Sequence, residues 1–141
     1  MKIAYSHLIK HIHEKPGIDE LSNRLFQLGH EHEIANDIFE IEFTPNRGDC
    51  LSINGLLRDL AVFYTIDFIN DIYEENLEPL ALNFKNLAPQ ICPHISFLML
   101  EIESVPDSYK GALKDYFSDL NLNKNNFFTD VSNYLSYEMG Q

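Results

Sequence analysis

Residues 44–52, with the sequence TPNRGDCLS, decide the fold expected for the first half of this chain. Proline, asparagine, glycine and aspartate are typical of turns, because they favour turn dihedrals or hydrogen-bond their own backbone. Thr44, Pro45 and Asn46 open the stretch, and Arg47 and Asp49 are placed to pair across the turn. It therefore predicts a rigid turn.

A helix is expected directly after this turn. Ser52 is a favourable N-cap residue, because its hydroxyl can accept a hydrogen bond from a free backbone N–H of the first helical turn. Residues 52–64 then carry apolar side chains at helical spacing on more than one side. The pattern predicts the most buried helix of the protein.

Two strands are expected before the turn, at residues 31–34 and 38–43. The second strand alternates acidic and apolar residues, which gives one wet and one dry face. Only residues 35–37 separate the two strands, so they are expected to pair as a hairpin. Glu40 and Glu42 share a face, with Glu31 and Glu33 as their possible opposites. Paired carboxylates can catalyse proton transfer when burial keeps one protonated, but the alternation predicts a solvent-facing strip instead.

Four further helices and one further strand are expected from periodicity and from helix start and stop signals. In the first half, Gly29 is expected at the C′ position of the second helix, where a left-handed backbone favours glycine. In the second half, Thr129 or Asp130 is expected to cap the last helix. The predicted helices span residues 4–13, 19–28, 106–120 and 129–139, and the predicted strand spans 95–102.

Composition excludes several classes of protein. The chain has 141 residues, with 10 Lys and Arg against 22 Asp and Glu, a net charge of −12. Without a basic stripe, it lacks the charge that nucleic-acid binding requires. No apolar run approaches the roughly 20 residues of a membrane span. Nor is there a signal peptide or a disulfide framework, so a cytoplasmic location with two buried thiols is expected.

The six histidines raise the possibility of a metal site. His7 and His11 are four residues apart on one helix face, and His30 and His32 share a strand face, so four imidazoles are available for zinc. Their spacing is not a known metal signature, and packing roles are expected instead. A Cys–His nucleophile would have to come from Cys50, or from Cys92 with His94, and no third group is evident to orient it. We therefore expect no catalytic residue and no metal site.

Residues 44–61 closely resemble the beta subunit of bacterial phenylalanyl-tRNA synthetase. Gly48 stands where the family has a proline, and the rest of the TPNRGDCLS core matches. Further blocks are similar to the family at residues 28–33, 92–93, 129–134 and 138–141, with Tyr5, Leu8 and Ile12 matching near the start. The resemblance thus extends over nearly the whole chain. Family members usually have aromatic residues at the positions of His7 and His11, which favours packing over metal binding.

The resemblance implies an α+β protein with two modules. Residues 1–75 are expected to form a small winged-helix-like helical domain with a β-hairpin. Residues 76–87 are expected to be a linker, and residues 88–141 part of the α/β editing domain (B3/B4-like). The tRNA-binding barrel that most relatives insert before the TPNR motif is absent, because only residues 34–43 separate the flanking blocks.

The resemblance also implies a function, as part of phenylalanine–tRNA ligase, an aminoacyl-tRNA synthetase. The chain would contribute scaffold, subunit packing and the beginning of the region that edits misacylated tRNA. Asn133 would belong to the editing pocket, with residues 129–132 shaping its wall; alternatively, Asn133 only holds a turn or a helix start. The chain ends before the family's editing histidine, and His94, Ile95 and Asn123 depart from the pattern. We therefore expect it to be inactive alone.

Expected partners follow from the same resemblance. They are the synthetase alpha subunit and, through the complete enzyme, tRNA(Phe), without a membrane. No cofactor is expected in this chain, since ATP and Mg²⁺ would belong to the parent enzyme. Two alternatives stay open: a stand-alone winged-helix-like module that binds a protein or nucleic acid, and a histidine-rich metal protein.

Overall fold

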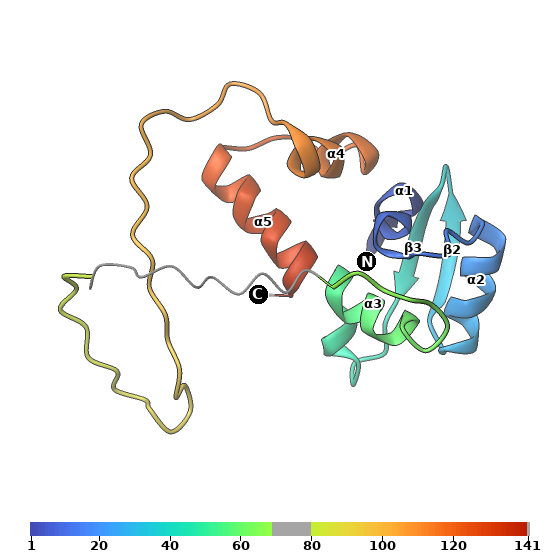
Figure 1. Ribbon diagram of the computed structural model, residues 1–141, viewed down its shortest axis with the longest axis horizontal. Coiled ribbons are helices and arrows are strands. Elements are labelled where there is room, and N and C mark those ends of the chain that lie inside the picture. The colour runs from blue at the N-terminus through green and yellow to red at the C-terminus, as the bar shows by residue number, and fades with distance from the viewer. Residues whose placement is uncertain (69–79, 141) are drawn as a thin grey trace. The chain divides into compact units, whose positions relative to one another are not determined.

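The computed structural model describes residues 1–68 and 80–140 and has a mixed α and β architecture (Figure 1). The chain divides into two compact units. One contains Met1–Ile69 with Pro106–Gln141, and the other contains Asn70–Val105. The first unit holds every helix and strand of the described residues. The expected linker at 76–87 lies partly outside those residues, and that domain boundary stays a prediction.

A three-stranded antiparallel sheet forms the centre of the first unit, in the order β1-β3-β2. Strands β2 (Glu31–Ala35) and β3 (Ile38–Glu42) form the expected hairpin. Its two-residue turn, Asn36 and Asp37, has φ values of 52° and 60°. Asparagine and aspartate tolerate this left-handed conformation best after glycine, which explains the sharp reversal. Strand β1 (Lys2–Ala4) was not expected, because three residues are too few to show a period of two.

The helices of the first half follow the predicted positions closely. The helix expected at 4–13 is divided into α1 (Tyr5–Leu8) and a 3₁₀ turn, η1 (Ile9–His11). Helix α2 (Ile18–Gln27) is confirmed, and Gly29 after it has φ +82°, as its C′ position requires. Helix α3 (Ile53–Leu60) begins after the TPNRGDCLS turn, as predicted.

Both helices of the second half begin at other residues than predicted. Helix α4 (Gly111–Asp119) begins later than the predicted residue 106. Helix α5 (Phe127–Met139) begins before the predicted cap: the side chain of Asn126 accepts from the backbone N of Thr129 at 3.1 Å. Asp130 is instead buried, where it accepts from the Tyr109 hydroxyl at 2.6 Å.

The strand predicted at 95–102 is wrong. In the second unit, described residues 80–105 contain turns and bends but no strand or helix. Ile95, Phe97 and Leu98 are exposed, at 42%, 50% and 65%. An alternating pattern produces a strand only where another strand completes its hydrogen bonds. The one sheet of the described residues is completed by β1, β2 and β3.

The hydrophobic core lies between the sheet and the helices of the first unit. Phe39 and Ile41 of β3 are fully buried, as the dry face of the alternating strand predicts. Burying each such side chain stabilises the fold by roughly 1.5–3 kcal/mol. The fully buried helical residues that complete this core are Leu8, Leu21, Leu25, Ile53, Leu56, Leu57 and Leu60. Across the described chain, no helix has the length and apolar character that a bilayer span requires.

Candidate functional site

The TPNRGDCLS turn is an ordered element that positions the start of α3. The backbone N of Arg47 donates to the carbonyl oxygen of Thr44 at 2.9 Å, and a 3₁₀ turn, η2 (Gly48–Cys50), follows. Ser52 is buried, and its hydroxyl oxygen accepts from the backbone N of Gly55 at 3.0 Å. The predicted cap is therefore confirmed. Thr44, Pro45 and Asn46 lie exposed on the outer side of the turn.

Arg47 joins the turn to α3. Its Nε donates to Asp49 Oδ1 at 3.1 Å, which confirms the predicted pairing. Its Nη2 lies 2.5 Å from Asp59 Oδ2 on α3 and 2.8 Å from the sulfur of Cys50. Arg58 of α3 pairs with Asp49 from the other side. One guanidinium thus holds three groups from two elements in fixed positions.

His30 completes this network from the end of α2. It is almost fully buried, and its Nε2 lies 3.0 Å from Asp59 Oδ2. Burial raises the pKa of the Asp59 carboxyl, but hydrogen bonds from Arg47 and His30 outweigh burial and leave the pKa below its usual value. The hydrogen bond from Arg47 lowers the pKa of Asp49 to about 2. Both carboxylates are therefore ionised at neutral pH.

Gly55 explains why the turn lies so close to the helix. A Cβ atom at this position would overlap the carbonyl oxygen of Asp49 and lie 2.9 Å from its carbonyl carbon. It would also lie 3.1 Å from the Cα of Cys50. Only glycine leaves room for this backbone approach.

This network is built for structure rather than for nucleophilic chemistry. Burial raises the pKa of the Cys50 thiol to about 11, with the neighbouring Asp59 charge acting in the same direction. At neutral pH the reactive thiolate is therefore scarce. Cys92 is exposed, which corrects the expectation of two buried thiols, and its sulfur lies 3.8 Å from the backbone oxygen of His94.

The acidic strip on the hairpin is confirmed. Glu31 lies opposite Glu42, and Glu33 lies opposite Glu40, with all four residues exposed. Lys2 of β1 pairs with Glu40 at 3.3 Å. Because all four are exposed, the strip lacks the burial that would hold one carboxyl as the acid in acid–base catalysis.

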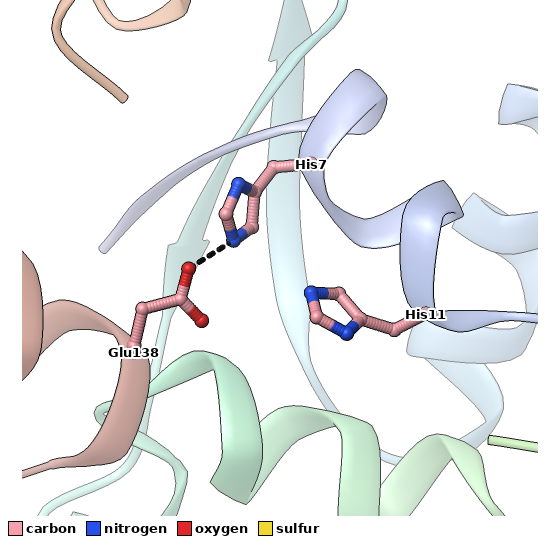
Figure 2. Close-up of side chains that lie close together, drawn as sticks. All are labelled: His7, His11 and Glu138. Atoms are coloured by element: carbon pink, nitrogen blue, oxygen red, sulfur yellow. Dashed lines mark ion pairs between the residues drawn. The ribbon is translucent and has the colours of Figure 1, made fainter. Parts of the chain in front are cut away.

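The four histidines considered for zinc do not converge. His30 contacts Asp59, as described above, whereas Nε2 of His32 lies 2.8 Å from the Ser22 hydroxyl. His7 and His11 instead face Glu138 of α5, and Nε2 of His7 lies 2.6 Å from Oε1 of Glu138 (Figure 2). The sequence analysis missed Glu138, because no local spacing relates the first turn of the protein to the end of α5.

Asn133 lies in the interior of α5 and is exposed. It therefore holds neither a turn nor the helix start, since the helix begins at Phe127. A hollow on α5 is lined by other residues of that helix, namely Phe128, Val131, Ser132, Leu135 and Met139. A role for Asn133 in an editing pocket stays a prediction.

Sequence comparison relates the chain to one group of curated proteins. It is 58% identical over 40 residues to the phenylalanine–tRNA ligase beta subunit of Wolinella succinogenes, a match to 28% of this chain and 5% of that protein. It is 30% identical over 117 residues to the beta subunit of Psychrobacter arcticus, covering 77% of this chain and 14% of that subunit. It is 30% identical over 136 residues to the beta subunit of Gluconobacter oxydans, which covers 91% of this chain and 16% of that subunit.

The chain therefore spans a small part of the length of the curated relatives it matches. No family model matches it. No solved structure matches it with significance.

Proposed function

Because this chain is a relative of one part of the phenylalanine–tRNA ligase beta subunit, we propose that it acts as a scaffold segment of that ligase. The observation that carries the proposal is the 30% identity over 91% of the chain, together with the ion-paired network that joins the TPNRGDCLS turn to α3. The proposed role is subunit packing and the beginning of the editing region for misacylated tRNA.

The strand order supports a winged-helix-like first domain. In the antiparallel order β1-β3-β2, the hairpin of β2 and β3 forms the wing and the short strand β1 pairs with β3. Helices α1 and α2 lie between β1 and β2 in the sequence. The finer assignment of residues 88–141 to an editing domain rests on the resemblance of residues 92–93 and 129–134. In this proposal, Asn133 and residues 129–132 would meet the missing part of the editing pocket in the complete subunit.

The chemistry of the described residues supports a role without catalysis. Arg47, Asp49 and Asp59 hold one another, and the Cys50 thiol is un-ionised at neutral pH. The net charge of −12 disfavours independent tRNA binding. Contact with tRNA(Phe), and the use of ATP and Mg²⁺, would therefore come through the complete enzyme in the cytoplasm.

The packing role can be tested by coexpression with the phenylalanine–tRNA ligase alpha subunit of the source organism. We expect the untagged chain to copurify with a tagged alpha subunit, alone or with the remainder of the beta subunit. Gel filtration of the mixture measures the complex. Separate elution of all components would contradict the packing role.

The expected lack of independent editing needs its own assay. The purified chain is incubated with Tyr-tRNA(Phe), and release of tyrosine is compared with the uncatalysed rate. We expect no acceleration, because the Cys50 thiol is un-ionised at neutral pH and the acidic strip of the hairpin is exposed. Robust hydrolysis would overturn the scaffold proposal, and tight filter binding of tRNA at low salt would favour the stand-alone binding module.

A further inference from the structure

Three metal-ligating side chains from opposite ends of the chain meet in the first unit. His7 and His11 come from α1 and η1, and Glu138 comes from the last turn of α5. Each offers one ligand atom, and these atoms all lie within 4.8 Å of one another. Figure 2 shows the two imidazoles and the carboxylate pointing toward a common space. We call this set the His–His–Glu cluster.

The cluster holds a polar atom that the protein alone does not fully satisfy. His7 is 5% exposed, and its Nε2 has no hydrogen-bond partner of acceptable geometry among the described residues. The same atom lies at ion-pair distance from Glu138, 2.6 Å from Oε1. The buried Nε2 of His7 therefore has a close charged neighbour but no well-aligned hydrogen bond.

Neighbouring groups hold two of the ligands in orientation. The imidazole rings of His7 and His11 lie beside each other, with 5.6 Å between their centroids. The ring of Tyr137 lies edge-on to His7, with 5.6 Å between ring centroids. These ring contacts restrict the orientation of the two imidazoles.

The geometry is close to what a tetrahedral ion requires. Zinc binds histidine nitrogen at about 2.0–2.1 Å and carboxylate oxygen at about 2.0–2.2 Å, which separates two ligand atoms by roughly 3.4 Å. The 2.6 Å between His7 Nε2 and Glu138 Oε1 would have to widen by roughly an ångström, and no separation in the cluster exceeds 4.8 Å. Two imidazoles with one carboxylate suit zinc and its first-row neighbours, whereas Mg²⁺ and Ca²⁺ prefer oxygen ligands alone.

A second cluster of metal-ligating residues shows why this one is distinctive. His30, Cys50 and Asp59 also lie within 4.8 Å of one another. There the guanidinium of Arg47 contacts both Asp59 and Cys50, so a fixed cation already occupies the position that a metal would need. Among the described residues, no Lys or Arg forms an ion pair with the His–His–Glu cluster.

We propose that His7, His11 and Glu138 form a Zn²⁺ site that connects the first helix to the last helix of the unit. The protein supplies three ligands, and water takes the fourth position. The inference goes beyond the proposed scaffold role and does not depend on it. It also replaces the sequence-based expectation that the chain holds no metal.

The bound ion would connect the first helix to the last helix of the unit. Helix α5 contacts α3, and it meets α1 through the His7–Glu138 pair and the ring of Tyr137 beside His7. A bound ion that joins both helices stabilises the folded state by mass action, because the unfolded chain does not bring these ligands together. Docking of α5 would then depend on zinc.

The test uses the full chain, purified without a tag and stripped with a chelator. Isothermal titration calorimetry is expected to show one Zn²⁺ bound per chain. The midpoint temperature of thermal unfolding is expected to rise by roughly 5–10 °C when free Zn²⁺ is a hundredfold above its Kd. Glu138→Gln keeps the size of the side chain and removes the anionic ligand. It is expected to weaken binding at least tenfold, as is His11→Ala.

His94→Ala is the matched control, because His94 is an exposed histidine of the second unit. It is expected to bind Zn²⁺ as the unchanged protein does. Circular dichroism checks that each variant is folded, and the tetrahedral Co²⁺ absorption of the unchanged protein supplies a readout that needs no variant. Absence of stoichiometric binding, or equal affinity in Glu138→Gln and the unchanged protein, would overturn the proposal. Neither result bears on copurification with the alpha subunit.

Discussion

The substitution Gly55→Ala tests whether the TPNRGDCLS turn is held against α3 by close backbone approach. The added Cβ would overlap the carbonyl oxygen of Asp49 and lie 3.1 Å from the Cα of Cys50. Both obstacles are backbone atoms, so the clash cannot be relieved by rotating a side chain. The turn has to move away from the helix, and the contact between Arg47 and Asp59 has to lengthen.

The expected magnitude follows from two opposing terms. Alanine in a helix interior is favoured over glycine by about 1 kcal/mol. Overpacking a tight site costs typically 1–3 kcal/mol, and an overlap with backbone places Gly55→Ala at the upper end of that range. The free energy of unfolding should therefore fall by about 2 kcal/mol, which lowers the urea midpoint by roughly 1 M and the Tm by roughly 5–10 °C.

Gly48→Ala provides the matched control in the same motif. A Cβ at Gly48 meets no atom within 4 Å, and its φ is not in the left-handed region. This substitution should be neutral or stabilise the protein by up to about 1 kcal/mol, because it restricts the unfolded chain. The assay is urea unfolding followed by circular dichroism. If Gly55→Ala unfolds at the same urea concentration as Gly48→Ala, the turn is not docked as described.

Three further predictions concern Ser52, Asp49 and the two cysteines. Ser52→Ala should reduce the free energy of unfolding by about 1 kcal/mol in the urea assay, because it removes the cap to Gly55; an unchanged midpoint would argue against that cap. The ionised Asp49 carboxylate stabilises the fold above its usual pKa of 3.8, and this contribution is lost as the pH falls toward the folded pKa of about 2. Asp49→Asn should therefore show a weaker loss of stability than the unchanged protein between about pH 5 and pH 3, and equal acid sensitivity would refute the Arg47 pairing. A thiol-reactive disulfide reagent should label exposed Cys92 rapidly and buried Cys50 only after unfolding. Rapid labelling of both thiols in the native protein would contradict the burial of Cys50.

Local signals predicted the first half of the fold well. Gly29 ends α2 because a left-handed residue is needed there, and Ser52 begins α3 because its hydroxyl satisfies a free N–H. The hairpin followed from alternation in β3 and a short connection rich in turn residues. In each case the physical cause lies within a few residues of its effect.

Features that depend on distant partners were not predictable in this way. Strand β1 exists because its residues pair with β3, since three residues carry no period of their own. Conversely, residues 95–102 alternate as a strand does but find no strand to pair with among the described residues. Asp130 was expected as a cap, but the Tyr109 hydroxyl, which donates to it from before α4, places it in a buried position instead.

The two clusters of metal-ligating residues show the same limit for function. Sequence spacing grouped His7 and His11 with His30 and His32, although the fold sends the second pair to Asp59 and Ser22. Residue types alone do not separate the two clusters either, since each combines histidine with a carboxylate.

What separates them is the nearest fixed charge. Arg47 neutralises Asp59 in one cluster, whereas in the other the ion-pair partner of Glu138 among the described residues is the imidazole of His7. A cation from solution gains more where the protein has supplied none of its own. Zinc should therefore bind between α1 and α5 and leave the network around Arg47 unchanged.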